Sequence, residues 1–378
     1  MTEMACRACR DRTGDLVLDL GEQPASDFFP RFDAPGPDPL YPLQMWLCSA
    51  CHLAQLVADP TVPDEPRGAE PAALVRQASD AVSRVAAAGL LPAGGQVAEY
   101  GSPHGGSWLA NLAAQGLSLA QDGEPADVVL DCFGLMHSAD QAAALADRVA
   151  RVAASGVLLL QYHSLATIAR REQWNALRHG HYAYYSTAAI VSMLDRHDFR
   201  PRFAWQFPLY GGTVLLAASR AGVGTSGRGG PAESVGAVLA EEASAGVCDP
   251  GSLRGLQHSV RARADALHEW LVSQGSAGRR VLGYGAASRA VSLLRQAQAD
   301  SSLLPAIVDA SPAKHGLRMP GTDIPIVSPA ELAARKPDSV LLLLSDLRSE
   351  VRAAFPEVEL AGGRWVDVET IGAVMADG

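Results

Sequence analysis

No stretch of apolar residues in this sequence approaches the roughly 20 residues that a membrane-spanning helix needs. The chain also lacks an apolar leader, since it opens with MTEMACRACR, and it lacks a stripe of basic residues interleaved with aromatic ones. Its formal net charge is −10 at pH 7. These absences argue against a membrane segment and against nucleic acid or an anionic membrane as a partner. They favour a cytoplasmic protein in a reducing compartment.

Cysteine is scarce, with 6 residues in 378, yet most of it lies in two Cys-x-x-Cys pairs. The doubled spacing is typical of a tetrahedral zinc site, because each two-residue spacer lets both thiolates face one centre. Four sulfur ligands leave no open coordination position, so we expect a structural zinc ion. Free thiols or two disulfides are the alternative, and the lone Cys132 and Cys248 are expected to be ordinary core or surface thiols. The expected ligands are Cys6, Cys9, Cys48 and Cys51.

Length and composition divide the chain. At 378 residues the chain is longer than one hydrophobic core ordinarily supports, so two or three domains are expected. The Pro/Asp-rich stretch 57–68 contains too many helix and strand breakers to be an element, and the Gly/Ser-rich stretch 219–234 is typical of a flexible linker. We predict a zinc-binding module at 1–66, a middle lobe at 67–219, a linker at 220–232 and a C-terminal lobe at 233–378.

Both lobes show the alternating pattern of α/β folds. In the middle lobe a helical pattern precedes a strand and glycine turn at 96–106, as in dinucleotide-binding and methyltransferase units. The C-terminal lobe repeats the order of strand, glycine turn and helix from 281, which predicts a doubly wound lobe. We therefore expect a zinc-ribbon-like module, a truncated methyltransferase-like (Rossmann-type) lobe and a second α/β lobe. The other predicted middle-lobe elements are helices at 71–91 and 139–153 and strands at 126–136 and 155–164.

The interval after the first glycine turn is unusually short. Only the stretch from Gly101 to Ala126 separates this turn from the next long strand, and one parallel crossover needs about a dozen residues besides its strands. A full S-adenosylmethionine fold places a second and a third strand in this interval, and their carboxyl ends bind ribose and adenine. The segment 117–122 can supply the second strand, with Asp122 as the ribose acid. No residues remain for the third, so we predict that the adenine pocket is missing or built from elsewhere.

Histidines are the chemical candidates in the middle lobe. His137 follows a predicted strand, and His179 and His181 lie in a Tyr-rich segment suited to a pocket wall. Histidine is the natural general base near neutral pH, although an ordinary core or surface histidine is the alternative for each. In the C-terminal lobe, Asp309 ends a strand about two dozen residues after Gly285, a spacing typical of nucleotide-binding units. The alternative to a nucleotide-binding turn is that Gly283 and Gly285 merely permit a tight turn.

Longer motifs resemble the nucleotide-sugar C-methyltransferases that build branched deoxysugars in antibiotic biosynthesis. The similar segments are CRACRDRTGDLVLDLGEQPASDFF, YPLQMWLCSACHLAQL, HGHYAYYSTAAI, VLGYGAASRAVSLL and IVDASPAKHGLRMPGTDIPIVSP. The resemblance implies a nucleoside-diphosphate 4-keto-deoxysugar as substrate, with dTDP as the expected nucleotide, bound between the two lobes. It also implies a histidine that removes the proton alpha to the ketone, after which the enolate attacks the methyl group of S-adenosylmethionine. By position, His181 matches the family's base and His137 its second active-site histidine.

The resemblance also implies which residues contact the ligands. Arg289 and Lys314 are placed to meet a diphosphate. The expected substrate-binding residues are Tyr184, Tyr210, Gly211, Gly212, Gly283, Gly285, Ser288, Arg289, Asp309 and Lys314. The expected cofactor residues, if S-adenosylmethionine binds, are Glu99, Gly101, Gly105 and Asp122.

The chain departs from the family around the cofactor and the base. The family's cofactor turn G-x-N-D-G reads GSPHG at 101–105, and the aromatic-rich segment that precedes this lobe is replaced by EPRGAEPAALVRQ. The family's Y-x-E-H pattern becomes Arg178, His179, Gly180 and His181. Together with the short interval, these changes make S-adenosylmethionine a doubtful cofactor.

Three functions remain open. The first, which the short interval favours, is enolisation of a keto-sugar nucleotide without S-adenosylmethionine, giving epimerisation, tautomerisation or elimination. His181 would be the base, His137 or Arg178 would stabilise the enolate, and His179 is a further catalytic candidate; Arg178 would supply a permanent cation. The second is an ordinary S-adenosylmethionine-dependent C-methyltransferase. The third is a non-catalytic protein that binds a sugar nucleotide.

Overall fold

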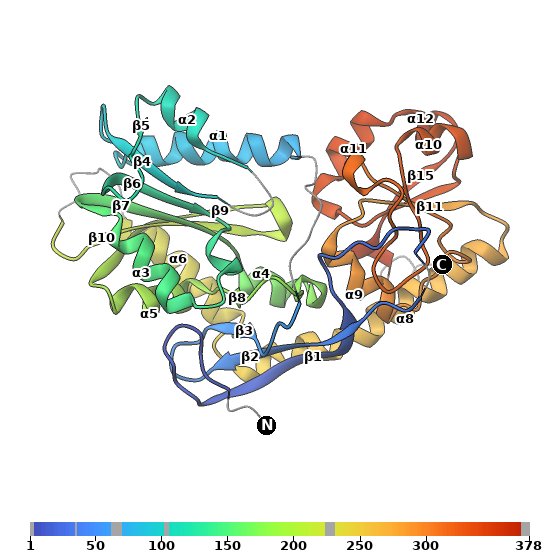
Figure 1. Cartoon of the computed structure of the whole chain (residues 1–378), viewed down its shortest axis with the longest axis horizontal. Helices are drawn as coiled ribbons and strands as arrows, with labels where there is room; N and C mark the ends of the chain where they lie inside the picture. The colour runs from blue at the N-terminus through green and yellow to red at the C-terminus, as the bar shows by residue number, and fades with distance from the viewer. Residues whose placement is uncertain (1–3, 35, 62–69, 102–105, 224–230, 372–378) are drawn as a thin grey trace.

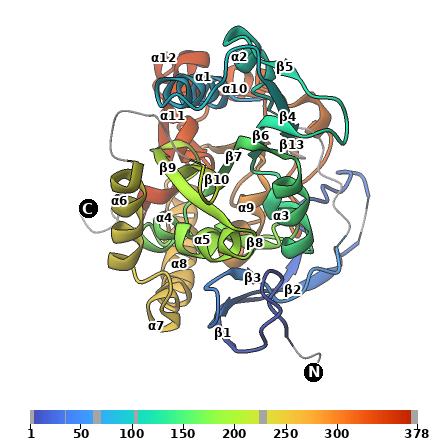
Figure 2. The same ribbon diagram turned by 90° about the vertical axis from the view of Figure 1, so that its left-hand side faces the viewer.

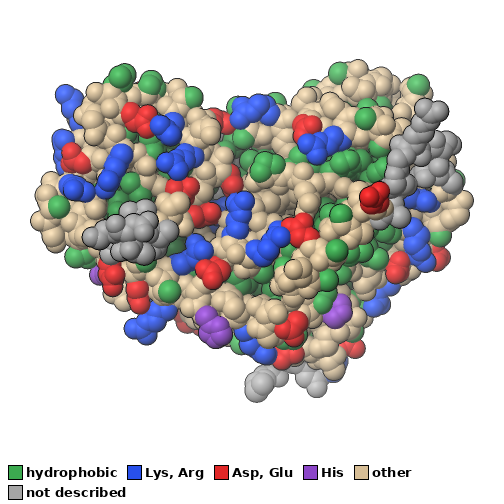
Figure 3. Space-filling view, turned by 180° about the vertical axis from the view of Figure 1, so that it is seen from behind, with side chains coloured by type: hydrophobic (Ala, Val, Ile, Leu, Met, Phe, Trp, Pro, Cys, Tyr) green, Lys and Arg blue, Asp and Glu red, His purple; other side chains and the backbone are tan. Residues whose placement is uncertain are grey.

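The computed structural model describes residues 4–34, 36–61, 70–101, 106–223 and 231–371. A small β-sheet module lies beneath two α/β lobes, and the outline is notched between the lobes (Figures 1 and 3). Within these residues we find no helix with the length and apolar character of a membrane span.

The N-terminal module is a four-stranded antiparallel sheet in the order β1-β2-β3-β8. Buried residues of β1, such as Val17 and Leu18, share a core with helices of the C-terminal lobe. The last strand, β8, comes from the middle of the chain, because Ala54 pairs with Tyr184 and Gln55 with Ala183. The His181 segment is therefore attached to the module's sheet. The strands are β1 (Gly14–Pro24), β2 (Leu40–Cys48), β3 (Ala54–Leu56) and β8 (Ala183–Tyr184).

The middle lobe contains a six-stranded sheet in the order β5-β4-β6-β7-β10-β9. The first four strands are parallel, and β10 is antiparallel to both of its neighbours. Its strands are β4 (Gln96–Tyr100), β5 (Ser118–Leu119), β6 (Ala126–Cys132), β7 (Val152–His163), β9 (Phe199–Phe207) and β10 (Thr213–Arg220). Its helices are α1 (Ala72–Ala87), α2 (Leu109–Ala114), α3 (Gln141–Ala150), α4 (Leu165–Arg170), α5 (Thr187–Asp195) and α6 (Pro231–Ser244). Helix α6 belongs to the predicted C-terminal lobe but packs here, where its Glu242 accepts the N–H of Thr187 at 2.6 Å.

Helices cover both faces of this sheet. Helices α1 and α2 lie on one face, and α3, α5 and α6 lie on the other (Figures 1 and 2). Strand β6 is almost entirely buried, as expected of a central parallel strand covered on both faces. The helix predicted at 139–153 is shorter than expected, because Val152 already pairs with Ala126 at the start of β7. Here the pairing of strands outweighs the helical pattern.

The short interval forms one short strand. Strand β5 pairs only with Gln96 and Val97, the first residues of β4. The chain then turns back, and Arg151 donates hydrogen bonds to the carbonyls of Glu124 and Gln121 at 2.8 and 3.2 Å. Between Gly106 and Ala126 we find no further strand, as the length of this segment predicts.

The C-terminal lobe is a five-stranded, entirely parallel sheet in the order β13-β12-β11-β14-β15. Helices α8 and α9 share one core with the N-terminal module, and a second core contains Leu332, Val351 and Val358 of the other helices. The doubly wound prediction is confirmed. The strands are β11 (Val281–Tyr284), β12 (Ile307–Val308), β13 (Ile326–Val327), β14 (Ser339–Leu342) and β15 (Arg364–Asp367). The helices are α7 (Pro250–Leu253), α8 (Gly255–Ser276), α9 (Ser288–Gln296), α10 (Ala330–Arg335), α11 (Arg348–Ala354) and α12 (Glu357–Leu360).

Polar contacts join the two lobes. The Glu350 carboxylate of α11 accepts the N–H groups of Ala72 and Ala73 at 3.0 and 2.9 Å, at the start of α1. Asp346 accepts the N–H of Gly211 at 3.0 Å, and burial raises the pKa of Asp346. These contacts join the two lobes near the carboxyl ends of the parallel strands in both sheets.

Candidate active site and metal centre

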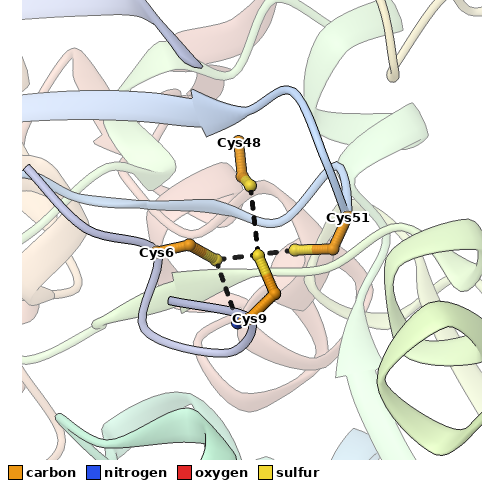
Figure 4. Close-up of side chains that lie close together, drawn as sticks. All are labelled: Cys6, Cys9, Cys48 and Cys51. Carbon is orange, nitrogen blue, oxygen red and sulfur yellow. Dashed lines mark hydrogen bonds between the residues drawn. The ribbon is translucent and has the colours of Figure 1, made fainter. Parts of the chain in front are cut away.

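The four paired cysteines form one cluster (Figure 4). Their Sγ atoms all lie within 4.8 Å of one another, and the Cys6–Cys51 and Cys9–Cys48 Sγ distances are both 3.5 Å. Zn–S bonds of about 2.3 Å in a tetrahedral site put sulfurs about 3.8 Å apart, so small shifts of the four side chains fit the cluster to zinc.

The thiols are unequal before any metal binds. The hydrogen bond with Cys51 lowers the pKa of Cys6 to about 5, while burial raises the pKa of Cys48 to about 11. Zinc binds thiolates, so loading of this site releases protons and depends on pH.

A cavity of about 290 Å³ lies between the middle and C-terminal lobes. It lies at the carboxyl ends of β6, β7 and β11, the edge at which open α/β sheets bind ligands. This cavity brings together most of the catalytic and substrate-binding residues that the sequence predicts. Those that line it are His137, Arg178, His181, Tyr184, Tyr210, Gly285, Ser288, Arg289, Asp309 and Lys314.

His181 and Arg178 form a buried pair in this cavity. Arg178 Nη2 lies 2.5 Å from His181 Nε2, and Arg178 Nη1 lies 2.6 Å from Asp27 Oδ1. The three residues are only 6 to 8% exposed. Because a guanidinium has donors and no acceptor, Nε2 of His181 must accept. His181 is thus a neutral imidazole that carries its proton on Nδ1.

Two further histidines surround His181. The His137 ring centroid lies 4.7 Å from that of His181, and its Nδ1 lies 3.0 Å from the carbonyl oxygen of Gly180. That oxygen can only accept, so Nδ1 of His137 donates. The His163 ring lies 6.3 Å from the His181 ring and stacks on Phe133 at 4.7 Å. The sequence analysis missed His163, although its place at the end of a buried apolar strand could have indicated it.

The segment that carries His181 is tightly held. Gly180 has φ +83°, and a Cβ there would lie 2.6 Å from Asp27 Oδ2, so only glycine fits. Asp59 accepts the N–H of Gly180 at 2.6 Å. The Tyr184 hydroxyl accepts the N–H of Arg178 at 2.9 Å, and burial raises the Tyr184 pKa.

The turn at Tyr210 is strained. Tyr210 has φ 54°, an unusual value for an aromatic residue, and lines the cavity, where burial raises its pKa to about 12. Gly211 and Gly212 do not line the cavity. They allow close packing on Gln173 and Thr167, because a Cβ at each glycine would lie 2.6 and 2.5 Å from those side chains.

The glycine turn of the C-terminal lobe faces the histidines across the cavity. Asp309 accepts the N–H groups of Ala286 and Ser311 at 2.7 and 2.8 Å, and Lys314 Nζ donates to the Ala286 carbonyl at 2.7 Å. Arg289 lies 3.3 Å from Glu369. Gly283 does not reach the cavity and packs instead against Ile307, 2.6 Å from the position of a Cβ.

His179 is not part of this cavity. It is 1% exposed, and its Nε2 lies 3.4 Å from the Pro42 carbonyl oxygen in the N-terminal module. Burial lowers the pKa of His179 and outweighs the attraction of Asp59. We assign His179 a packing role in place of the predicted catalytic one.

Replacing His179 with glutamine is expected to reduce acid sensitivity. A histidine with a lowered folded pKa contributes stability that is complete above the unfolded pKa of about 6.5 and is lost as pH falls below it. Urea unfolding near pH 7.5 and near pH 5.5 should therefore show a smaller loss in the variant than in the wild type. Exposed His258 changed to glutamine is the control, and an unchanged pH slope in His179→Gln would contradict this assignment.

The predicted cofactor residues are only partly brought together. Glu99 is the penultimate residue of β4, and its carboxylate accepts hydrogen bonds from the N–H of Trp108 at 2.6 Å and from the Ser107 hydroxyl at 2.5 Å. Gly101 is exposed, and Gly105 lies outside the described residues. Asp122 is exposed in the turn held by Arg151, at the amino end of the sheet and away from Glu99. Glu99 contacts Ser107 and Trp108, which line the cavity together with Cys132 and Phe133 at the end of β6. These residues lie at the carboxyl ends of β4 and β6, the edge of the sheet where S-adenosylmethionine would be held.

Two family models match this chain. The model described as "C-methyltransferase C-terminal domain" matches residues 208–368, and that described as "Putative zinc binding domain" matches residues 6–63. The curated relative NovU, a C-methyltransferase of Streptomyces niveus, is 27% identical over 220 residues. That match covers 57% of this chain and about half, 51%, of NovU.

Among solved structures, similarity is weak. Magnesium protoporphyrin IX methyltransferase of Synechocystis has a TM-score of 0.30 at 16% identity, over 40% of this chain and 84% of its own. Phosphoethanolamine N-methyltransferase 2 of Haemonchus contortus has a TM-score of 0.27 at 12% identity, over 72% of this chain and 68% of its own. Scores this low add no weight to the assignment.

The sequence matches bear on the functions left open above. They support the methyl-transferring alternative better than the reaction without S-adenosylmethionine, and they lend no support to the doubt about that cofactor. They also agree with the cysteine cluster as a zinc site. Residues 6–63 and 208–368 of this chain thus match the zinc-binding domain and the C-terminal domain of C-methyltransferases.

Proposed function

We propose that this protein is a C-methyltransferase that acts on a nucleotide-linked keto sugar and first removes the proton alpha to the ketone. The observation that carries this proposal is the contact of Arg178 Nη2 with His181 Nε2 at 2.5 Å, in the cavity between the lobes. The contact places a fixed cation and a neutral base side by side.

The donor, Arg178 Nη2, suits the carbonyl oxygen of a ketone, and the acceptor, His181 Nε2, suits the C–H group on the neighbouring carbon. The ketone oxygen takes an N–H from Arg178, which frees the Nε2 lone pair of His181. The proton moves from the carbon to Nε2, the C–H electron pair becomes the enolate double bond, and negative charge develops on the oxygen beside the guanidinium. A preorganised cation of this kind in a buried site is an effective stabiliser of an enolate.

The wall of the cavity that the C-terminal lobe forms has the groups that bind a nucleotide. The turn at Gly285, the start of α9 at Ser288 and the cations Arg289 and Lys314 all line the same cavity. Backbone N–H groups and cations near the start of a helix are favourable for phosphate oxygens. A diphosphate on this wall would direct its sugar toward His181.

S-adenosylmethionine, when bound, supplies an electrophilic methyl group to the enolate carbon. Support for this donor comes from the family and NovU matches. A specific observation favours a second candidate, reprotonation of the enolate without methyl transfer. The described part of the interval after Gly101 contains α2 and one two-residue strand, β5, and Asp122 lies at the amino end of the sheet.

The test combines a dTDP-linked 4-keto-deoxysugar with methyl-labelled S-adenosylmethionine in deuterated water. We expect label in the sugar, and a calorimetric isotherm for S-adenosylmethionine at concentrations above a micromolar dissociation constant. Deuterium at the alpha carbon without methyl transfer would overturn the proposal in favour of the second candidate. Neither deuterium nor label in the sugar would overturn both.

A further inference from the structure

We propose that Asp27, in the zinc-binding module, is a positioning residue for the base His181 and acts through Arg178. This inference rests on the proposed function, because it assigns Asp27 a part in presenting that base. It extends the active site to a segment of the chain about 150 residues away from the base in sequence.

The first support is an unbroken chain of contacts. Asp27 Oδ1 lies 2.6 Å from Arg178 Nη1, and Nη2 of the same guanidinium lies 2.5 Å from His181 Nε2. A planar guanidinium held at one nitrogen by a carboxylate presents its other nitrogen in a fixed direction. Asp27 thereby sets the position of the Arg178 N–H group that donates a hydrogen bond to Nε2 of His181.

The second support is that the chain makes room for this carboxylate. Gly180 lies directly before His181, and a Cβ at Gly180 would lie 2.6 Å from Asp27 Oδ2. With φ +83°, Gly180 also adopts a backbone conformation that other residues avoid. Backbone and side chain are both arranged around Asp27.

The third support is that the same loop contacts both lobes. Asp27 reaches Arg178 of the middle lobe, and the Phe29 ring lies 4.5 Å from Nζ of Lys314 in the C-terminal lobe. The Pro30 carbonyl accepts the N–H of Arg318 at 2.9 Å. The loop is therefore fixed at both sides of the cavity and can hold a side chain precisely.

Further contacts tie the base segment to the zinc-binding module. The N–H of Leu56 donates to the Tyr182 carbonyl at 3.2 Å, beside the pairing of β3 with β8. Asp59 accepts the N–H of Gly180 at 2.6 Å. Asp27 contacts the guanidinium of Arg178, the charged group that itself contacts His181 Nε2.

The test uses two matched variants. Asp27→Asn keeps the shape of the side chain and removes its charge. Asp38→Asn is the control, because Asp38 lies in the same module and pairs with Arg318 at 2.7 Å with both side chains about 10% exposed. The side chains of Arg178 and Asp27 are buried to nearly the same degree, with 10 and 8% of their surface exposed. The control thus breaks an equally buried ion pair that does not contact His181.

The decisive readout is the tautomer of His181, measured by ¹⁵N NMR on zinc-loaded protein and assigned by comparison with His181→Asn. We expect the wild type and Asp38→Asn to show a proton on Nδ1, and Asp27→Asn to gain the tautomer with the proton on Nε2. In turnover, Asp27→Asn should lower kcat by about 10- to 100-fold with little change in KM. Arg178→Lys, which keeps one charge but loses the planar fork, should show the same change if Asp27→Asn does not fold.

Each outcome is informative. Unchanged His181 signals in Asp27→Asn, or in Arg178→Lys where it replaces that variant, would overturn the proposal, as would an equal change in Asp38→Asn. If the wild type neither methylates nor exchanges the sugar but Asp27→Asn alone alters the tautomer, the positioning role stands and the proposed function fails.

Discussion

Cys51→Ser will lose bound zinc and the folded N-terminal module. Serine cannot replace a thiolate in a four-sulfur site, and structural zinc contributes about 10 to 16 kcal/mol of apparent binding energy in zinc-finger peptides. Cys51 is also fully buried in the core that the module shares with the middle lobe. We therefore expect zinc content, measured by plasma mass spectrometry, to fall from about one equivalent to near zero, with a lower melting temperature.

The control for this experiment is Cys248→Ser. Cys248 lies outside the cluster, next to the N-cap of α7, and is only half-buried. It should keep its zinc and its melting temperature. A Cys51→Ser protein with full zinc content and an unchanged melting temperature would show that the cluster does not hold a structural metal.

His181→Asn will abolish exchange of the alpha proton with solvent and, with it, turnover. Asparagine keeps a hydrogen-bonding group beside Arg178 but offers no basic nitrogen. Loss of a general base slows a reaction by about 10²- to 10⁴-fold, and NMR detection of deuterium at the alpha carbon measures the step directly.

Exposed His258 on α8, changed to asparagine, is the matched control and should exchange at the wild-type rate. Exchange that persists in His181→Asn would move the role of base elsewhere. His137 and His163 would then be the residues to test, since their rings lie 4.7 and 6.3 Å from that of His181.

Local signals predict much of the fold. The apolar runs of β6, β11 and β14 and the glycine turn before α9 are readable because buried parallel strands are apolar along their whole length. In the described part of the interval after Gly101 the one strand is β5, and crossover length limits how many strands so short a segment can form. The early start of β7 at Val152 was missed, because strand pairing is not a local property.

The candidate site is less readable from the sequence. His137 and His181 meet as expected, yet nothing in the sequence brings Asp27 to Arg178, 151 residues away. His179, only two residues from His181, faces Pro42 of the module, because the turn at Gly180, with φ +83°, breaks the alternation that would place residues two apart on the same side of an extended segment. Asp122 follows the predicted strand but lies in a turn whose neighbouring carbonyls, of Gln121 and Glu124, accept hydrogen bonds from Arg151, since β5 ends after two residues.

Strand β8 comes from the middle of the chain but completes the N-terminal sheet. This pairing limits how the domains of related proteins can be recombined. If the first sixty or so residues came from a homologue, the edge strand of the transferred sheet would have to pair with Ala183 and Tyr184 of this chain. Such a hybrid would leave ladder hydrogen bonds unmade next to the base, unless both segments were exchanged together. Residues on either side of this seam are therefore expected to evolve as a pair.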